Sequence, residues 1–328
     1  MLGVDTDFDT VATPVQVGVD RPRYLTDYSP QDKPWDVHRA QTQRVEGVYR
    51  GTIYDGLAGR LHGCSGFLGF AWAADDAGEL RLKLVRARFC RLRHCPTCQW
   101  RRSLMWQARF LKALPGIEAA HPKSHWLFLT LTVRNCEVSN LRQTLGSMNE
   151  AWGRLTKRRE FSGNVQGWIR TTEVTRGQDD SAHPHFHSLL MVRPSYFKKH
   201  YVTQSHWAEL WQECMRVNYR PIVDIRAVKA RRGAPGEKPL RRALAEVMKY
   251  SVKPSDMEGE WLLELTRQVR GLRFVASGGV LKNMLRESDE SEQDLLLADG
   301  NGEGGDPVLF FDWRREIRRY LEHSATKR

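Results

Sequence analysis

The stretch SAHPHFHSLLMV, residues 181–192, places three histidines at every second position directly before an apolar run. A period of two is typical of a β-strand, in which side chains two residues apart lie on the same face. His185 and His187 therefore project together and are close enough to bind one ion. His183 precedes Pro184 near the start of the strand, where the ladder constrains its orientation least.

A second alternating segment lies just upstream of the histidine strand. GWIRTTEVTRG (167–177) ends at a GQDD turn, which predicts an antiparallel hairpin with the histidine strand. Glu173 is the one carboxylate on the strand face that also carries Thr171 and Thr175. The hairpin places Glu173 beside the histidine pair. Two imidazoles and a carboxylate with open coordination positions suit a catalytic divalent ion. The spacing is equally compatible with histidines that only line a half-solvated strand.

The flanking segments predict a mixed α+β chain. Further strands are expected at residues 125–135 and 221–229, and helices at residues 138–160, 203–217 and 239–253. A basic helix at residues 99–114 should stop at Pro115. Towards the C-terminus we expect a short strand, a glycine turn and a helix at residues 272–285, and a terminal basic helix at residues 310–323.

The helix opened by Pro239 carries the sequence EVMKYSVKPSD, residues 246–256. Glu246 and Tyr250 are four residues apart and share one helical face, with Lys249 and Lys253 alongside. A tyrosine hydroxyl, with a pKa of about 10, is a poor nucleophile unless a cation polarises the target phosphate and nearby lysines favour phenolate. A carboxylate one turn away could position or deprotonate water. Taken alone, the pair also fits an ordinary tyrosine with an acidic neighbour.

Four of the six cysteines cluster in the first third of the chain. FCRLRHCPTCQWRR holds Cys90, Cys95 and Cys98, and LHGCSG places Cys64 upstream in a glycine-bounded turn. Four thiolates would close a tetrahedral structural zinc site and stabilise a small knob with little core of its own. Cys64 is the least constrained ligand.

Other arrangements of the cysteines stay open. His62 or His94 could take the place of Cys64 as a ligand, or the thiols could remain reduced without a metal. Cys136 and Cys214 lie in strand-end and helix contexts and are expected to be ordinary buried thiols.

The charge distribution indicates a polyanionic partner. Lys and Arg number 51 against 39 for Asp and Glu, a formal net charge of +12. Between Arg81 and Leu114 ten basic residues occur without an acid, a candidate DNA-contacting surface that includes Arg101 and Arg102. Eight acids without a base between Glu287 and Asp306 predict a solvated acidic linker.

Targeting signals are not apparent. No window approaches the roughly 20 apolar residues of a membrane span. The sequence MLGVDTDFDT is acidic where a signal peptide needs basic residues. We therefore expect a cytoplasmic protein that does not engage a membrane.

Three motifs in this order, FLTLT (128–132), HPHFHSLLMV (183–192) and EVMKYSVKPSD (246–256), resemble those of plasmid rolling-circle replication initiators, the single-tyrosine replication branch of the HUH endonucleases. The resemblance implies that His185 and His187 are the HUH metal ligands, with Mg²⁺ or Mn²⁺ as the ion. Tyr250 would nick the double-strand origin, stay joined to the 5′ phosphate and leave a priming 3′ hydroxyl. Glu246 matches the carboxylate that activates water to end the cycle. Glu173 as third ligand rests on strand geometry instead.

The resemblance also implies partners and a domain plan. The partners would be single-stranded or hairpin origin DNA and the host helicase and DNA polymerase, and a homodimer is compatible with it. The expected fold is α+β, an HUH-type antiparallel sheet flanked by helices, with an N-terminal cysteine-rich zinc-binding knob and a helical C-terminal extension. The expected regions are a flexible arm (1–50), the cysteine-rich zinc-binding and DNA-binding knob (51–116), the nuclease domain (117–256) and the extension with acidic linker and basic terminal helix (257–328). Lys249 and Lys253, on the tyrosine helix of the nuclease domain, are expected to bind DNA as well.

Two competing functions fit the same residues. A transposase or mobilisation relaxase would use the same HUH chemistry on different DNA ends. A zinc-dependent DNA-binding regulator would keep the cysteine site and use the histidine strand only structurally.

Overall fold

The computed structural model describes residues 22–74, 78–229, 239–249, 251–282, 295–296 and 307–323. The larger of its two sheets consists of β3 (His125–Thr132), β4 (Val165–Arg176), β5 (Ala182–Val192), β6 (Val223–Ala227) and β7 (Val275–Gly279). They are ordered β6-β3-β5-β4-β7, and every neighbouring pair is antiparallel. The expected α+β fold with an antiparallel sheet is confirmed, and the sheet carries the histidine strand near its centre.

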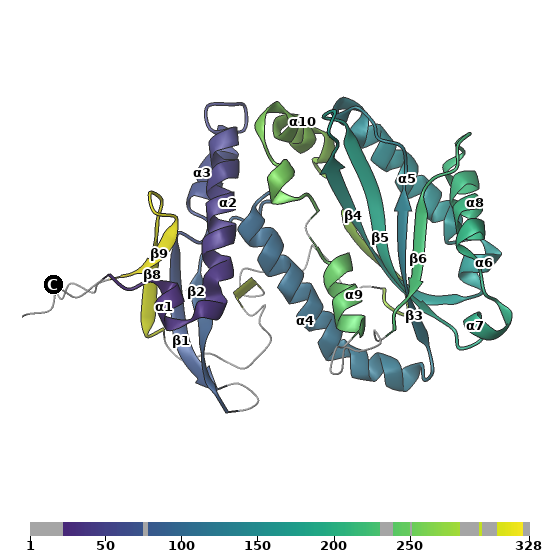
Figure 1. Ribbon diagram of the computed structural model, residues 1–328, viewed down its shortest axis with the longest axis horizontal. Coiled ribbons are helices and arrows are strands. Elements are labelled where there is room, and N and C mark those ends of the chain that lie inside the picture. The colour runs from purple at the N-terminus through teal and green to yellow at the C-terminus, as the bar shows by residue number, and fades with distance from the viewer. Residues whose placement is uncertain are drawn as a thin grey trace, which may run out of the picture.

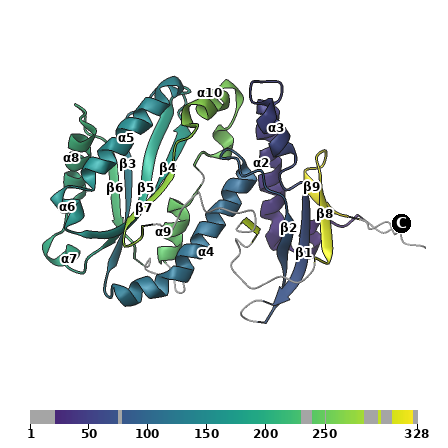
Figure 2. The same ribbon diagram turned by 180° about the vertical axis from the view of Figure 1, so that it is seen from behind.

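The smaller sheet contains β1 (Phe67–Ala74), β2 (Leu80–Ala87), β8 (Leu309–Arg314) and β9 (Arg319–Glu322), ordered β2-β1-β8-β9. It lies at one end of the molecule and the larger sheet at the other, with α4 (Pro96–Ala120) and α9 (Pro239–Val247) between them (Figure 1). The reverse view shows α5 (Leu141–Leu155), α6 (Arg159–Ser162) and α8 (Gln204–Met215) on the outer side of the larger sheet (Figure 2). One face of that sheet therefore meets α4 and α9, and the other meets the outer helices.

The hairpin of β4 and β5 forms as the sequence predicts. Gly177 donates its backbone N–H to the Ser181 carbonyl, and the Asp179 carboxylate accepts from the backbone N–H of Ser181. A Cβ atom at Gly177 would lie 2.5 Å from Ser181 Oγ, so the turn excludes a side chain there. This short turn pairs Glu173 with His185 and Thr171 with His187.

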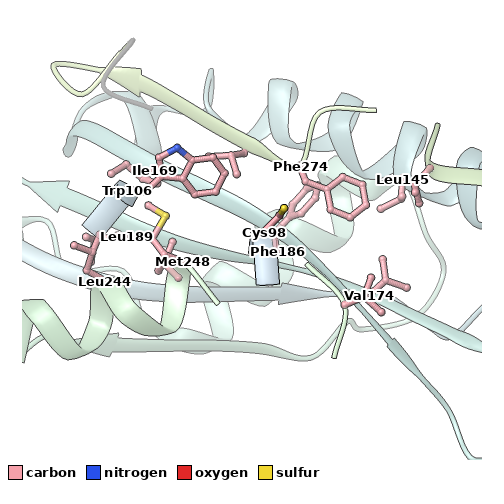
Figure 3. Packing of buried hydrophobic residues seen from close by; sticks show 14 of the residues in the cluster. Cys98, Trp106, Leu145, Ile169, Val174, Phe186, Leu189, Leu244, Met248 and Phe274 are labelled. Carbon is pink, nitrogen blue, oxygen red and sulfur yellow. The ribbon is translucent and has the colours of Figure 1, made fainter. Parts of the chain in front are cut away.

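The two faces of the larger sheet are buried by different helices. On the outer side α5 presents an apolar stripe with helical spacing, and Trp152 of that stripe contacts Phe186 edge-to-face. On the inner side Leu244 of α9 and nearby Met248 pack against Ile169 and Leu189 of the sheet (Figure 3). Both faces are thus covered, and the polar residues Glu173, His185 and His187 lie within the inner contact.

The expected flexible arm at residues 1–50 is wrong for the part that is described; residues 1–21 lie outside it. Residues 25–28 form α1 (Leu25–Tyr28), and Lys33–Tyr49 forms α2, a 17-residue helix. Trp35 is 1% exposed and contacts Phe70 and Trp100. Pro30 opens a short 3-10 helix and Pro34 lies in the first turn of α2, where a missing N–H leaves no hydrogen bond unmade.

The expected terminal helix at residues 310–323 is also wrong, because these residues form the hairpin β8–β9. Phe311 and Trp313 alternate inward, and β8 pairs with β1. Arg318, with φ 52°, supplies the left-handed turn residue. The abundance of Arg and Glu favoured a helix, whereas burial of the alternating aromatic residues decides for strands.

Three further predictions concern the end of α4, the C-terminal extension and the acidic linker. Helix α4 continues through Pro115 and ends at Ala120, five residues beyond the expected stop. The extension beyond residue 257 begins with α10 (Gly259–Val269). Most of the expected acidic linker, residues 287–306, lies outside the described residues. Among the helices that are described, none has both the length and the apolar composition needed to cross a membrane.

Glu46 of α2 joins the C-terminal hairpin to the knob. Its buried carboxylate accepts from Arg315 in the β8–β9 turn at 2.7 Å, and from Arg50 and His62. Burial alone would raise the pKa of Glu46, but these hydrogen bonds outweigh it and lower the pKa from 4.5 to about 2. A depressed carboxyl pKa stabilises the fold above the ordinary pKa, and this stabilisation is lost as the pH falls towards 2.

We therefore expect Glu46→Gln to lower the free energy of unfolding by about 2 kcal/mol at pH 7, because the charge-assisted bonds are lost. The difference from the wild type should shrink at pH 3, because the carboxyl of the unfolded chain, with its ordinary pKa of 4.5, is then protonated. Urea titrations at the two pH values measure both effects. The exposed Glu150→Gln, which loses a surface pair with Arg154, is the matched control and should change stability by less than about 1 kcal/mol. A deficit for Glu46→Gln that is equal at both pH values would contradict this role.

Candidate nuclease and metal site

Glu173, His185 and His187 come together on the inner face of the larger sheet. Glu173 Oε2 lies 3.0 Å from His185 Nε2 and 2.9 Å from His187 Nε2. All three side chains are largely buried, with at most 12% of each exposed. The register explains the arrangement, because Glu173 is directly opposite His185 and His187 is the next residue on the same face. Together they form a group that could hold one metal ion.

Hydrogen bonds on the far side of each ring orient the two histidines. His185 Nδ1 lies 3.2 Å from the His183 carbonyl oxygen, which can only accept, so Nδ1 carries a proton. His187 Nδ1 lies 3.1 Å from Thr130 Oγ1, a hydroxyl that can also accept. Metal-binding histidines commonly donate their second ring N–H in this way. The Nε2 atoms are thereby free to act as ligands.

The donor set fits a divalent cation. Two neutral Nε2 lone pairs and a carboxylate repel one another at these distances unless a positive charge lies among them. Burial raises the pKa of Glu173, but hydrogen bonds from His185 and His187 outweigh it and hold the pKa well below its usual range. Nitrogen and oxygen ligands in a buried group of three leave positions for water or a phosphate oxygen.

His183 lies beside the group without belonging to it. Its Nδ1 lies 2.6 Å from Asn135 Oδ1, and its carbonyl accepts the hydrogen bond that orients His185. The sequence did not single out Thr130 or Asn135 for these supporting contacts. For Thr130 a signal was present, since it lies within FLTLT and pairs with His187 across β3 and β5.

Glu246 opens onto the same space as His187. A cavity of about 460 Å³ is lined by Thr130 and His187 from the sheet and by Arg242 and Glu246 from α9. Glu246 is partly exposed and forms a 2.6 Å ion pair with Lys249. Its carboxylate is therefore accessible from this cavity, as a group that acts on water must be.

Tyr250 itself lies outside the described residues. Val247 and Ser251, which flank it in the sequence, are fixed by hydrogen bonds. Thr171 donates its hydroxyl hydrogen to the Val247 carbonyl at 2.6 Å. The Ser251 carbonyl accepts from the Val174 N–H at 2.9 Å, and the Ser251 N–H donates to Gln99 Oε1 at 3.0 Å. The tyrosine segment is thus tied to β4, the strand that carries Glu173. Gln99 was not anticipated from the sequence.

The expected DNA-binding residues divide into two groups. Lys249 and Arg102 line a second cavity, of about 470 Å³, and Lys253 is exposed. Arg101 is only 1% exposed and donates to the Leu295 and Leu296 carbonyls, so its expected role in DNA binding is wrong. It lies on the face of α4 that turns towards α2, where its guanidinium packs over the Trp35 ring.

The four knob cysteines form a second group that could hold a metal ion. Cys64 Sγ lies 3.5 Å from Cys95 Sγ and 3.6 Å from Cys98 Sγ, and Cys90 Sγ lies 3.6 Å from Cys98 Sγ. These separations are too long for disulfides. Backbone N–H groups of Cys90 and Cys98 point at two of the sulfurs. All four are free thiols in a buried, closely spaced set.

The alternatives to Cys64 as a ligand do not join this group. His62 is bonded to Glu46, and His94 lies 3.0 Å from the Tyr49 hydroxyl. Cys214 is buried as expected, whereas Cys136 is only half-buried, and both lie outside the group.

Comparison with known proteins identifies the family of this chain. A family model described as Replication protein matches residues 81–321. "Protein rep" of Bacillus amyloliquefaciens is 36% identical over 292 residues, which cover 83% of this chain and 80% of the relative. "Protein rep" of Lactiplantibacillus plantarum is 34% identical over 287 residues, covering 84% and 86%, and that of Lentilactobacillus hilgardii is 31% identical over 276 residues, covering 81% and 86%. No solved structure matches the chain.

The cysteine group gives a direct prediction. Purified wild-type protein should carry one tightly bound metal ion per chain that Cys95→Ser loses, since three sulfurs no longer close the site. Elemental analysis by mass spectrometry checks this without assuming the metal. Cys136→Ser changes a thiol outside the group and should keep the ion. Full metal content in Cys95→Ser would show that these cysteines are not the ligands.

Proposed function

Because this chain belongs to the family of replication proteins, we propose that it initiates plasmid replication by nicking one strand of the double-strand origin and later rejoining the displaced strand. The observation that carries the proposal is the group of Glu173, His185 and His187 on β4 and β5. Family membership supports replication, and the buried group beside the segment of Tyr250 supports phosphodiester cleavage.

In the proposed reaction His185, His187 and Glu173 hold Mg²⁺ or Mn²⁺. Bound there, the ion would polarise a non-bridging oxygen of the scissile phosphate. Tyr250 Oη gives up its proton to solvent and forms a bond to phosphorus, the bond from phosphorus to the 3′ oxygen breaks, and the 3′ oxygen takes up a proton from solvent. The protein then carries the 5′ phosphate, and the free 3′ hydroxyl primes leading-strand synthesis.

The surrounding residues support this chemistry through charge and position. The bonds from Thr171 and Val174 hold Val247 and Ser251, which flank Tyr250 in the sequence, against β4. Lys249 lies next to Tyr250 in the chain and provides a positive charge that favours phenolate. Glu246, accessible in the cavity that His187 lines, would accept a proton from water when the phosphotyrosine is resolved.

We also propose that the cysteine group holds Zn²⁺. Structural zinc sites commonly use four sulfur donors in a closed, buried set. Backbone N–H groups directed at the sulfurs would stabilise the negative charge of the thiolates. The ion would stabilise the loop between Cys90 and Cys98, which adjoins the larger sheet. In the cytoplasm the initiator would then work with the host helicase and DNA polymerase.

The competing functions are less well supported. The relatives named above are all replication proteins, which favours an initiator over a transposase or mobilisation relaxase. A regulator without nuclease activity would have no use for two buried imidazoles whose Nε2 atoms converge on a carboxylate.

Tyr250→Phe should abolish covalent protein–DNA adducts, because the phenyl ring has no oxygen to attack phosphorus. The measurement is a denaturing gel after incubation with a single-stranded origin oligonucleotide and Mn²⁺. Affinity for the oligonucleotide should stay within about twofold, since one hydroxyl contributes little to backbone binding. Tyr201→Phe removes an exposed hydroxyl elsewhere and should form adducts normally. Adducts that persist in Tyr250→Phe would remove it as the nucleophile.

Glu246→Gln should spare nicking and slow the release of DNA from the covalent adduct by about 100-fold, the usual range for loss of a general base. The two steps are separated by following adduct formation and adduct decay in one time course. Glu258→Gln, an exposed carboxylate outside the site, should leave both rates unchanged. Equal slowing of formation and decay by Glu246→Gln would mean that Glu246 acts in nicking itself.

A further inference from the structure

The second cavity lies where the knob meets the larger sheet. Its knob side is lined by Arg60, Arg91 and Arg102, and its sheet side by Thr171, Lys249 and Ser251. Lys249 and Ser251 are the neighbours of Tyr250 on either side, so the cavity borders the tyrosine segment. It shares no lining residue with the cavity of His187 and Glu246. The two cavities are distinct but adjacent, because Lys249, which lines one, forms an ion pair with Glu246, which lines the other.

A smaller cavity of about 290 Å³ extends this space along the knob. It shares Arg60 and Arg91 with the second cavity and adds Arg88. We call the joined space lined by Arg60, Arg88 and Arg91 the arginine trough. It runs from the cysteine group, through Cys90, to the tyrosine segment. A chain lying in it would pass from the knob to the nucleophile.

The trough is electropositive. Arg60 donates to the carbonyl oxygen of Cys90 at 2.6 Å, a partner that orients the guanidinium and leaves its charge in place. Arg88 and Arg91 form no ion pair with any acid in the described parts of the chain. Among the described residues that line the two cavities, none is Asp or Glu. Three guanidinium groups without a counter-charge attract a polyanion, and their forked donors match phosphate oxygens.

The dimensions and the aromatic residues indicate what kind of polyanion fits. A space of about 470 Å³ is of the size that accepts one small ligand or nucleotide, well below that of a double helix. The three aromatic rings at the wall of the trough are buried and offer no free stacking face: Phe274 is 2% exposed, Trp106 5% and Phe89 6%. Recognition by base stacking is therefore disfavoured, and contact with the sugar–phosphate chain is favoured.

We infer that the arginine trough binds the sugar–phosphate chain of single-stranded DNA directly next to the scissile phosphate. This rests on the proposed nicking function and adds a role for the knob, which supplies the phosphate-binding wall of the nuclease site. Gln99 strengthens the connection, because it follows Cys98 in the chain and accepts the Ser251 N–H. The knob thereby contacts both the bound strand and the segment that carries the nucleophile.

The test is the double variant Arg88→Gln/Arg91→Gln, which leaves Arg60 and its bond to Cys90 intact. Binding of 5′-fluorescein dT₂₀ and dC₂₀ is measured by polarisation in EDTA over a range of KCl concentrations. If each arginine neutralises one phosphate, the slope of log affinity against log salt should become shallower by about 1.4, equally for both probes. Arg159→Gln, an exposed arginine of α6 on the outer side of the sheet, is the control and should leave the slope unchanged.

Several results would overturn the inference. These are a slope no shallower than that of Arg159→Gln, a loss confined to a duplex probe, or a change in the ratio of dT₂₀ to dC₂₀ affinity, which would indicate base contacts. An unchanged metal content and melting temperature in the double variant establish that it is folded.

The experiment also separates the trough from the nicking function. With single-stranded origin DNA and Mn²⁺, the double variant should need a higher DNA concentration than the wild type to reach the same adduct yield. A wild type that shows the trough's salt dependence but forms no adduct would refute the nicking function and leave the trough standing. A wild type that forms adducts but lacks that salt dependence would refute the trough and leave the nicking function standing.

Discussion

Glu173 faces His185 across β4 and β5, and the remainder of the site depends on this single register. Side chains alternate along a strand, so a slip by one residue would turn Glu173 to the outer face and leave both imidazoles without a carboxylate. The turn at Gly177 holds the register because it is closed by the N–H to carbonyl bond with Ser181. The next residue on the same face, His187, then completes the group without any further constraint.

The same strand also positions the residues that flank Tyr250 in the sequence. Thr171 is one same-face position before Glu173, and Val174 is the residue after it; each bonds one side of the tyrosine segment. Strand β4 thus carries the candidate ligand Glu173 and contacts both flanks of Tyr250 within a few residues. From the opposite direction Gln99 contacts Ser251, which links the cysteine group to the same segment. Two candidate metal groups, far apart in the chain, therefore converge on one short stretch.

Local patterns in the sequence predict the central part of this arrangement. The alternation around His185 and the GQDD turn are sufficient to place Glu173, since an antiparallel hairpin has few registers that bury one face. Cysteine spacing likewise predicts that Cys90, Cys95 and Cys98 group together, whereas the choice of Cys64 over His62 or His94 follows only from the structure. These features depend on residues close in the chain or on side-chain types with narrow chemical uses.

Features that depend on distant contacts could not be predicted in the same way. Arg101 is adjacent to Arg102 in a basic helix, yet only the structure shows that it is buried against Trp35 and bonded to Leu295. The hairpin at residues 309–322 forms because β8 pairs with the edge of β1. The charged residues of this segment are common in helices, so the sequence alone favoured a helix. Gln99 acquires its role only through Ser251, 152 residues later.

The central claim is that Glu173, His185 and His187 hold one divalent ion. Anomalous diffraction from crystals soaked in Mn²⁺ tests it most directly. The account predicts a single strong anomalous peak on the inner face of the larger sheet, about 2.0–2.2 Å from both Nε2 atoms and from a Glu173 oxygen. Density that is absent there while Mn²⁺ supports nicking, or a peak bound by other residues, would contradict it.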